Sequence, residues 1–313
     1  MNSENLSRRR FLETAAIAAG ALALTNTPVS GQQVAATPPA TAPAIAAAKR
    51  TASDIVPLGN TGLKVSRLGL GLGSSNGQVQ ATGGQDRFNA FIKHAFDQGI
   101  TMFDTASNYR TYSLMGPAIK GLPREKIFIQ SKIEQPNDIL GRIDNHRKTF
   151  NTDYVDSMLV HIQYRENWLD TWKRALDDYK TAQEKKWIKA RGVSCHSLPA
   201  LRAAVAHDWT EVHLVRVNPQ GYRMDTERQV QDTRIADDIK PVLAEMKKMR
   251  DKQRGVIGMK IFGDGQMRTE AEREKSIKFA MSMPEIDSVI IGFSSIDEMD
   301  QGIKLMNKVL AQA

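Results

Sequence analysis

Short apolar runs alternate with longer stretches of helical periodicity from residue 65 to the end of the chain. Each run is bounded by polar or turn residues, which is the pattern of strands buried in a parallel sheet. Between the runs, apolar residues recur three and four positions apart, as Trp168, Trp172, Ala175 and Tyr179 do, and this spacing predicts amphipathic helices. The pattern predicts eight strands, at residues 65–71, 101–105, 126–132, 154–161, 190–195, 212–217, 255–261 and 288–292.

Eight strands that are each followed by a helix favour a parallel (β/α)8 barrel, the TIM barrel, and residues 53–313 have the size of one such domain. A doubly wound open sheet is the second interpretation, but it needs a GxGxxG motif after its first strand. Gly69, Gly71 and Gly73 resemble that motif only in composition, because the third glycine comes one residue early and no helix begins there. Ahead of the first strand, turn residues between short apolar stretches at 58–66 predict a β-hairpin.

The N-terminal segment reads as an export signal rather than as part of the fold. Residues 7–12 read SRRRFL and precede the uncharged run AAIAAGALAL, a combination that forms a twin-arginine motif. The run is too short to span a bilayer, so we expect a signal peptide at 1–36 and no stable membrane insertion of the mature protein. Residues 37–52 are rich in Ala, Pro and Thr and predict a flexible linker. We therefore expect the twin-arginine translocase as a partner during export, and a periplasmic or other extracytoplasmic location.

Composition argues against several classes of partner. The net charge of +8 is spread over helical faces such as residues 240–252, where acidic residues interleave, so a solvated surface explains it. The chain has no compact basic arm and no aromatic–basic stripe, so we expect no nucleic-acid partner. Cys195 is the only cysteine, which rules out an intrachain disulfide, and the six histidines lack ligand spacing. We therefore expect no metal site.

The second, third and fourth predicted strands each end at or near an ionisable residue. These residues are Asp104, Lys132 and His161, and Tyr109 follows Asp104 by five positions. Catalytic side chains of a (β/α)8 barrel project from the carboxyl ends of its strands. Each residue has an ordinary structural explanation when taken alone, such as a helix N-cap for Asp104. Four such residues at consecutive strand ends favour catalysis.

These residue types suit the reduction of a carbonyl group. Tyr109 would protonate the developing alkoxide, but a phenol with a pKa near 10 gives up its proton poorly unless a cation stabilises the phenolate. Lys132 would supply that cation and lower the pKa of Tyr109, while Asp104 would hold Lys132 in place. His161 would face the carbonyl oxygen. Tyr112 is a weaker rival for the acid because it lies three residues later, and we expect it in the wall of the substrate pocket.

Six segments, taken in order, give the chain a resemblance to the aldo-keto reductases. They read LGNTGLKVSRLGLG, GITMFDTASNY, LMGPAIKGLPREKIFIQSK, DYVDSMLVH, KWIKARGVS and VIIGFSS, and the resemblance extends over residues 54–313. It implies a barrel with an N-terminal hairpin cap. It also implies an oxidoreductase that transfers hydride between NADP(H) or NAD(H) and a small carbonyl or alcohol substrate. The motifs give Asp104, Tyr109, Lys132 and His161 the four roles described above.

The resemblance implies that the strand ending GVSCH reaches the nicotinamide, with the Ser194 hydroxyl on its carboxamide. Cys195 stands where the family usually has asparagine, and a thiol is a poorer hydrogen-bond partner. Arg216 stands where many members have glutamine. Met259 takes the place of an aromatic ring that stacks on the nicotinamide, and a thioether can still pack on a ring face. Lys260 would meet the pyrophosphate.

The adenosine end of the cofactor is implied at VIIGFSSIDEMDQ, which contains Gly292, Ser294, Ser295 and Glu298. The amides at the start of the final helix suit a phosphate. Members that prefer NADP carry a basic side chain near the position of Glu298, whereas a carboxylate would repel the 2′-phosphate and could bond a ribose hydroxyl. Glu298 is equally explained as a first-turn glutamate that the helix dipole favours. The choice between NADP and NAD therefore stays open.

Two further functional hypotheses remain. The first is a catalytically idle barrel of the same family that acts as a binding or regulatory protein. Cysteine at position 195 and arginine at position 216, where the family usually has other residues, favour this hypothesis. The presence of all four predicted catalytic residues opposes it. The second is a glycosidase, which requires paired carboxylates at strand ends. Asp104 has no acidic companion at the other predicted strand ends, so this hypothesis ranks last.

Overall fold

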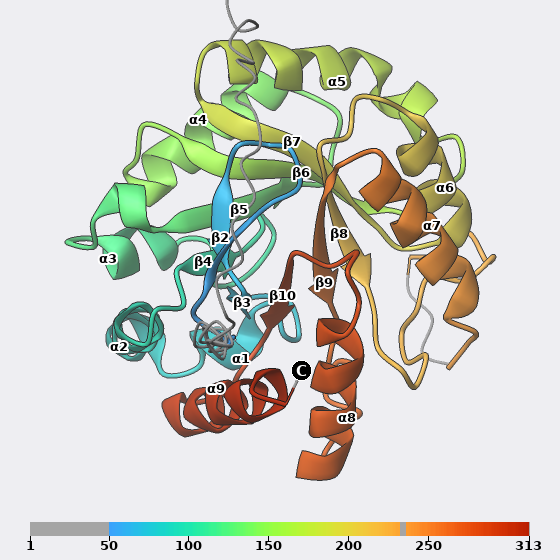
Figure 1. Cartoon of the computed structure of the whole chain (residues 1–313). Helices are drawn as coiled ribbons and strands as arrows, with labels where there is room; N and C mark the ends of the chain where they lie inside the picture. The colour runs from blue at the N-terminus through green and yellow to red at the C-terminus, as the bar shows by residue number, and fades with distance from the viewer. Residues whose placement is uncertain (1–49, 232–235, 313) are drawn as a thin grey trace, which may run out of the picture. The chain divides into compact units, whose positions relative to one another are not determined.

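The computed structural model describes residues 50–231 and 236–312, so the predicted signal peptide at 1–36 and most of the predicted linker lie outside the described residues. Within the described part, eight parallel strands close into a barrel in the order β10, β3, β4, β5, β6, β7, β8 and β9 (Figure 1). This confirms the predicted (β/α)8 barrel. The strands are β3 (Leu68–Gly71), β4 (Met102–Asp104), β5 (Phe128–Ile133), β6 (Val155–Gln163), β7 (Ile188–Cys195), β8 (Val212–Arg216), β9 (Gly255–Met259) and β10 (Ser288–Ile291).

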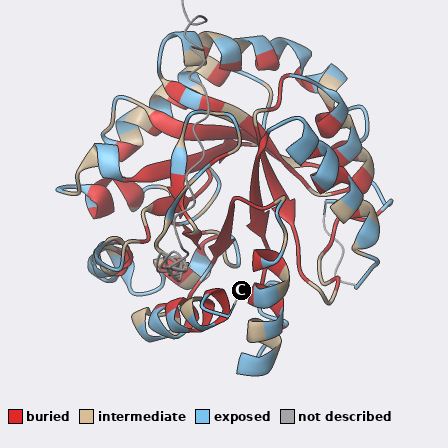
Figure 2. Ribbon diagram, viewed as in Figure 1, coloured by how far each residue is buried: buried red, intermediate tan, exposed pale blue. Residues whose placement is uncertain are grey.

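Helices surround the strands (Figure 1), and Figure 2 shows the strands buried while the helices are buried mainly on one side. In α5, for example, Trp168, Trp172 and Tyr179 are all buried, as their helical spacing predicts. The long helices are α2 (Gly84–Asp97), α4 (Ile139–Phe150), α5 (Trp168–Glu184), α6 (Leu198–Ala206), α7 (Lys240–Asp251), α8 (Glu270–Met281) and α9 (Ile296–Leu310). The shorter ones are α1 (Gln78–Ala81), α3 (Met115–Ile119) and the 3-10 helix at Arg124–Lys126.

The predicted hairpin is present and is formed by β1 (Ile55–Pro57) and β2 (Lys64–Ser66), which pair antiparallel. The first predicted strand, 65–71, is therefore two strands, of which only the second enters the barrel. Arg67 separates them because its amide donates to Asp54 O at 2.8 Å and its guanidinium pairs with the Asp54 carboxylate at 3.2 Å. These long-range contacts are invisible to a local apolar pattern.

The hairpin closes one end of the barrel with apolar side chains. Leu58 and Val65 are fully buried and join an apolar cluster with side chains from the barrel strands: Met102, Phe128, Leu159, Ala190, Val212, Leu214, Ile257, Met259 and Ile290. Gly59 lets the turn approach closely: it has a φ of +50°, and a Cβ there would overlap the backbone of Arg254 and Gly255. Residue 255 begins β9, so the hairpin seals the amino-terminal end of the strands and leaves the carboxyl end as the mouth.

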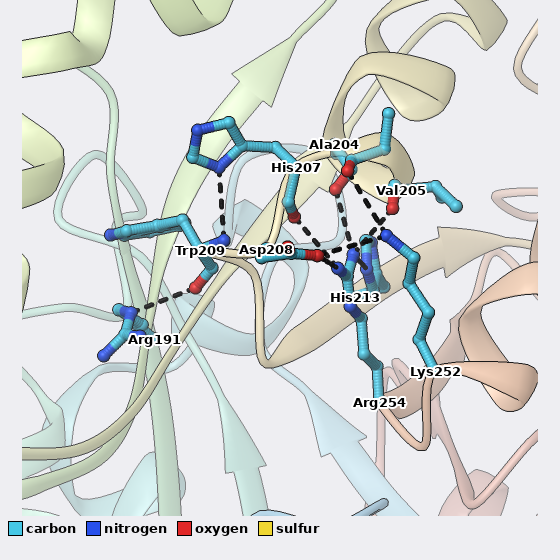
Figure 3. A network of polar contacts seen from close by, with 10 residues as sticks. Arg191, Ala204, Val205, His207, Asp208, Trp209, His213, Lys252 and Arg254 are labelled. Carbon is cyan, nitrogen blue, oxygen red and sulfur yellow. Dashed lines mark hydrogen bonds and ion pairs between the residues drawn. The ribbon is translucent and has the colours of Figure 1, made fainter.

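Arg254 ties α6 to the start of β9 (Figure 3). Its buried guanidinium donates to three backbone carbonyls at the carboxyl end of α6, those of Ala204 at 3.1 Å, Val205 at 3.0 Å and His207 at 3.0 Å. The last carbonyls of a helix have no partner within the helix, and a guanidinium can satisfy several of them at once. Nη1 of Arg254 also lies 3.4 Å from Nε2 of His213, which is buried in β8. This network therefore stabilises the closed end of the barrel.

Across residues 50–231 and 236–312, no helix combines the length and the apolar character that crossing a membrane requires.

Candidate active site

Three neighbouring strands bring the predicted catalytic residues to one end of the barrel. Asp104 ends β4, Lys132 is the penultimate residue of β5 and His161 lies near the end of β6. Because the strands are parallel and adjacent, with Asp104 opposite Gln130 and Lys132 opposite Leu159, their carboxyl ends share one rim. Tyr109 lies in the loop that follows β4. The structure thus brings the four predicted residues together at the mouth.

Asp104 and Lys132 form a buried ion pair. Nζ of Lys132 lies 2.7 Å from Oδ2 of Asp104 and donates to Thr105 O at 2.8 Å, and the two side chains are 1% and 4% exposed. The other Asp104 oxygen accepts from Nε2 of Gln130 at 2.8 Å. Burial lowers the pKa of Lys132, whereas the Asp104 carboxylate raises it and so favours the ammonium. Asp104 therefore holds Lys132 in one position, as the sequence predicts.

Tyr109 lies between this pair and His161. Its hydroxyl is 3.5 Å from Nε2 of His161, the two rings meet edge to face at 5.7 Å, and Nζ of Lys132 is 5.1 Å from the centre of the phenol ring. A Cβ on Gly73 would overlap this ring and lie 2.8 Å from its hydroxyl. Gly73 therefore makes room for Tyr109. In the sequence, its glycine-rich surroundings draw attention only as an imperfect nucleotide-binding motif.

The electrostatics at Tyr109 differ from the prediction. Burial raises the pKa of Tyr109 above its ordinary value, and the carboxylates of Asp104 and Glu134 add to the increase. The hydrogen bonds of Lys132 go to Asp104 and Thr105, which leaves the ammonium facing the ring rather than bonded to the hydroxyl. Burial, with Lys132 and Lys260 nearby, holds the pKa of His161 well below its usual range, so its imidazole is neutral. In this state the phenol retains its proton.

Glu134 is a site residue that the sequence reasoning missed. It follows β5 directly, and its Oε1 lies 3.5 Å from Nδ1 of His161 and accepts a hydrogen bond from Nδ2 of Asn108. Asp104 therefore does have an acidic neighbour at the next strand end, which corrects the sequence expectation. The arrangement still does not resemble a glycosidase pair, because both Asp104 oxygens are occupied by Lys132 and Gln130.

Tyr112, the rival acid, packs against α4. Its ring meets His146 at 4.9 Å and Phe150 at 5.2 Å, and its hydroxyl accepts from Nδ2 of Asn145 at 3.2 Å. Both the ring and the hydroxyl of Tyr112 therefore contact side chains of α4. Tyr109, in contrast, contacts His161 directly.

The predicted nicotinamide residues lie at the ends of β7 and β8. Ser194 is buried and its hydroxyl has no hydrogen-bond partner among the described residues. Buried hydroxyls are seldom left without a partner, so this one fits an incoming amide group such as the carboxamide. Cys195 is also buried, and burial raises the pKa of its thiol well above the ordinary value. Cys195 therefore remains a weakly polar thiol.

Arg216 is held by Asp225, a second residue that the sequence reasoning missed. Nε of Arg216 lies 3.7 Å from Oδ1 of Asp225, and the two side chains are 1% and 0% exposed. Nη2 of Arg216 also donates to Gln231 O at 3.3 Å. Burial raises the pKa of Asp225 to about 7, although Arg216 opposes this increase. Asp225 lies far along the loop after β8, so only the fold reveals its pairing with Arg216.

Lys260, which is predicted to meet the pyrophosphate, also forms an ion pair with a carboxylate. Met259 ends β9 and is largely buried. Lys260 follows with a φ of +58°, and its ammonium lies 3.0 Å from Oδ1 of Asp264, whose other oxygen pairs with Arg223 at 3.1 Å. The cation expected to meet a phosphate therefore has a carboxylate beside it, although 27% of the Lys260 side chain is exposed to solvent.

At the predicted adenosine end, Gly292 directly follows β10 and Ser295 is the N-cap of α9. Glu298 turns back toward this N-cap: its Oε2 accepts from the amide and the hydroxyl of Ser294, both at 2.7 Å. Its Oε1 lies 3.0 Å from Nη2 of Arg273 on α8. Glu298 thus places its own negative charge where helix amides would meet an anion. Arg273 is a cation at this end that the sequence reasoning missed.

Within the described residues, no cluster of three or more His, Cys, Asp or Glu side chains is arranged to hold a metal ion. The site is built instead from a phenol, an imidazole and a buried ion pair at the mouth of a barrel. These side chains lie at the carboxyl ends of the barrel strands, where barrel enzymes place their catalytic residues.

Comparison with known proteins identifies the family. The family model described as the aldo/keto reductase family matches residues 67–249, which is more than half of the chain. The chain belongs to this family of oxidoreductases. Its sequence is 32% identical to a probable aldo-keto reductase of Glycine max over 180 residues, and 29% identical to a glyoxal reductase of Bacillus subtilis over 147 residues. These matches cover 51% and 45% of this chain, and 50% and 49% of the relatives, so the chain spans about half the length of the curated relatives it matches.

Solved structures share the fold. A putative aldo-keto reductase from Pseudomonas aeruginosa has a TM-score of 0.67 at 20% identity, with 83% of this chain and 97% of that chain covered. The holo form of an aldo-keto reductase from Bacillus halodurans has a TM-score of 0.64 at 14% identity, with 82% and 95% covered. At these identities the similarity concerns the barrel and not the substrate.

Proposed function

We propose that this protein is an NAD(P)-dependent oxidoreductase that interconverts a small carbonyl compound and its alcohol, with Tyr109 as the general acid. One observation carries the proposal: the Tyr109 hydroxyl contacts the His161 imidazole at 3.5 Å, beside the buried pair of Asp104 and Lys132. This is an acid, an orienting imidazole and a fixed cation at one barrel mouth, which is what carbonyl reduction needs.

Each of these side chains has a role that follows from its surroundings. Tyr109 keeps its proton until a strong base forms at the substrate oxygen. An alkoxide is a much stronger base than a phenolate, so a phenol with a raised pKa can still protonate it. Lys132, held by Asp104, then lies beside the ring to stabilise the phenolate. The neutral His161 orients the carbonyl oxygen without adding a charge.

The cofactor would be NADP(H) or NAD(H), and it would supply or accept the hydride when bound. Ser194 and Arg216 would hold its carboxamide, because one has a buried hydroxyl without a partner and the other a fixed guanidinium. Cys195 would line the same wall, and Met259 would pack on the ring face. Lys260 would meet the pyrophosphate. At the adenosine end, Gly292, Ser294, Ser295 and Glu298 would form the remaining contacts.

Turnover of a panel of simple aldehydes with NADPH and with NADH tests this function. Glyoxal belongs in the panel because it is the substrate named for one relative. We expect activity in the wild type and a loss of about 100-fold or more in kcat for Tyr109→Phe. Tyr112→Phe is the matched control and should retain activity, because Tyr112 contacts α4. Equal rates in Tyr109→Phe and the wild type would remove Tyr109 as the acid.

The same experiment separates the enzyme from a catalytically idle barrel. Cysteine at position 195 and arginine at position 216, which depart from the usual residues of the family, favour the idle alternative. A protein that binds the dinucleotide tightly but transfers no hydride to any aldehyde would establish that alternative. Fluorescence titration with each cofactor, run beside the kinetics, distinguishes the two outcomes.

We also propose that the protein is exported by the twin-arginine translocase with its cofactor already bound, and that it works in the periplasm. The motif at residues 7–12 supports export, and this pathway carries folded proteins. Free nicotinamide cofactors are not supplied outside the inner membrane, so a cofactor that enters with the protein would have to be recycled there between two substrates. Its substrates would be small carbonyl compounds and alcohols.

Fractionation of cells tests the export proposal. The paired change Arg8→Lys with Arg9→Lys should leave the protein in the cytoplasm, whereas the control Arg10→Lys should still be exported. Mass spectrometry of the mature periplasmic protein should then find a bound dinucleotide. Export without any bound nucleotide would contradict loading in the cytoplasm but not the export itself.

A further inference from the structure

The buried ion pair of Asp104 and Lys132 cannot resupply the Tyr109 phenol with protons from solvent. If Tyr109 gives its proton to a substrate, it must recover one from water before the next cycle. Lys132 and Asp104 are 1% and 4% exposed, and their polar atoms bond to each other, to Thr105 and to Gln130. This pair can stabilise a phenolate, but it has no direct contact with bulk water.

On the other side of Tyr109, a chain of contacts does reach solvent. The phenol hydroxyl lies 3.5 Å from Nε2 of His161, and Nδ1 of the same ring lies 3.5 Å from Oε1 of Glu134. The His161 side chain is 3% exposed, whereas that of Glu134 is 32% exposed. An imidazole can take a proton at one nitrogen and release one at the other, so this ring can connect a buried group with an exposed one.

We propose that Glu134, His161 and Tyr109 form a proton relay between solvent and the catalytic phenol, with Glu134 as the outer member. This inference rests on the proposed function and adds a residue to it. To recharge the phenolate, the Glu134 carboxyl gives its proton to Nδ1 of His161, and the proton on Nε2 moves to the Tyr109 oxygen. The imidazole ends neutral, with its proton on Nδ1, and Glu134 ends as a carboxylate. Before the next reduction, water reprotonates Glu134, and the imidazole exchanges its proton from Nδ1 to Nε2 through water that enters the site when the product leaves. Alcohol oxidation runs the same transfers in reverse.

The chemistry of each member suits the relay. Burial raises the pKa of Glu134, which brings this carboxyl closer to the pH at which it can both accept and return a proton. The imidazole is neutral, so it starts with one protonated and one bare nitrogen, as a relay requires. The contact between Tyr109 and Nε2 of His161 is a long hydrogen bond, whereas Nδ1 of His161 has no hydrogen-bond partner among the described residues and lies 3.5 Å from Glu134. Catalytic contacts that are long without substrate commonly tighten when the substrate binds.

The other charged and titratable groups around His161 do not offer the same route. Lys132 on β5 is committed to Asp104, and Lys260 after β9 is paired with Asp264. His196 after β7 lies edge-on to His161 at 6.4 Å, and its Nδ1 contacts Gln231 O at 2.8 Å. Only Glu134, among the described residues that contact His161, combines a titratable oxygen on Nδ1 with substantial exposure to water.

Nitrogen-15 NMR of histidine-labelled, cofactor-free protein tests the inner contact directly. We expect His161 to carry its proton on Nδ1 at a pH where Glu134 is ionised, with the signals assigned by their loss in His161→Gln. Glu134→Ala should abolish this preference. Glu125→Gln removes a carboxylate from the opposite end of β5 and should leave the tautomer unchanged. A protonated Nε2 in the wild type that does not respond to Glu134→Ala would overturn the proposal.

Kinetics of the holoenzyme then separate a relay from a merely positioning role. Glu134→Gln keeps an oxygen for Asn108 and for Nδ1, but it cannot accept or return a proton at neutral pH. We expect kcat for alcohol oxidation to fall about 10-fold or more while KM stays within about two-fold, and the Nδ1 tautomer to persist. If Glu134→Gln has the wild-type kcat and only Glu134→Ala is impaired, Glu134 positions His161 and the relay is refuted.

The outcomes also distinguish this inference from the proposed function. A wild type without turnover on any substrate refutes both, since no proton then has to be supplied. A wild type that turns over normally while Glu134→Gln is unaffected refutes the relay alone.

Discussion

Arg273 and Glu298 form an ion pair at the start of α9, with 3.0 Å between Nη2 of Arg273 and Oε1 of Glu298. The other carboxylate oxygen accepts two hydrogen bonds from Ser294. The predicted adenosine end therefore contains the Arg273 cation, but the Glu298 carboxylate is already paired with it. A 2′-phosphate would have to displace Glu298 or share Arg273 with it, whereas a free ribose hydroxyl would not.

This pairing predicts that Glu298 controls the choice between the two cofactors. In Glu298→Gln, Arg273 loses its charged partner and becomes available to a phosphate, so the ratio of NADPH to NADH affinity should rise about 10-fold. Glu298→Arg should shift it further. The measurement is a fluorescence titration of each variant with both cofactors.

Arg273→Gln in the Glu298→Gln background is the control, and it should return the ratio toward that of the wild type. An unchanged ratio in Glu298→Gln would show that this end of the site does not read the 2′ position.

Gly73 should be intolerant of any side chain. A Cβ at this position would overlap the ring of Tyr109, so Gly73→Ala should displace the phenol from His161. We expect kcat to fall about 100-fold, because a shift of about 1 Å in a catalytic group can have that effect. The check is steady-state kinetics beside a thermal melt. Gly265→Ala is the control for replacing a glycine without steric overlap: no atom lies near the new Cβ, and its positive φ of +86° adds a backbone strain that Gly73 does not have.

Arg254 should be important for stability rather than for catalysis. Arg254→Met removes the donor for the carbonyls of Ala204, Val205 and His207 and leaves them buried, which we expect to cost about 3–5 kcal/mol in the free energy of unfolding. Lys252→Met should have a much smaller effect, because Lys252 is a partly exposed side chain whose ion pair is with Asp208, an exposed carboxylate that also pairs with Arg254. Urea denaturation measures both. Equal destabilisation by the two variants would contradict a special role for the buried guanidinium.

Stability should fall in mild acid because several buried histidines, among them His146 and His213, must remain neutral in the fold, although Asp225, whose pKa burial raises to about 7, opposes part of this fall. Burial holds the pKa of His146 at about 4 and that of His213 at about 3, against an ordinary value near 6.5 in the unfolded chain. Between these values the unfolded chain binds more protons, so the free energy of unfolding decreases as the pH drops below about 6.5. At pH 5 each histidine should account for about 2 kcal/mol of this loss.

Urea unfolding at pH 7.5 and at pH 5 checks this expectation. In His213→Gln the difference in unfolding free energy between the two pH values should be smaller than in the wild type, because one of these histidines has been removed. An unchanged difference in both His213→Gln and His146→Gln would mean that other groups dominate the acid sensitivity.

The barrel could be predicted because its signal is local and repeated. Each strand is an apolar run, and each helix has an apolar stripe, such as Trp168, Trp172 and Tyr179 on α5. Asp104, Lys132 and His161 could be singled out because strand ends in a barrel are where chemistry lies, and the fold then brings them together without further information. The division of the predicted strand 65–71 escaped prediction because it depends on the contact of Arg67 with Asp54.

The partners of the site residues could not be predicted, because they come from distant segments that look ordinary in the sequence. Glu134, Asp225 and Arg273 are three of many charged residues in this chain. Only the fold shows that they face His161, Arg216 and Glu298. The pKa of Tyr109 escaped prediction for a related reason, since burial and nearby carboxylates outweigh a lysine that faces the ring.

The close approach of Gly73 to Tyr109 has a consequence for engineering. On that side Tyr109 packs against a residue without a side chain, so no side chain can be shortened there to admit a bulkier molecule. Attempts to widen the range of accepted molecules must therefore change side chains elsewhere around the mouth of the barrel.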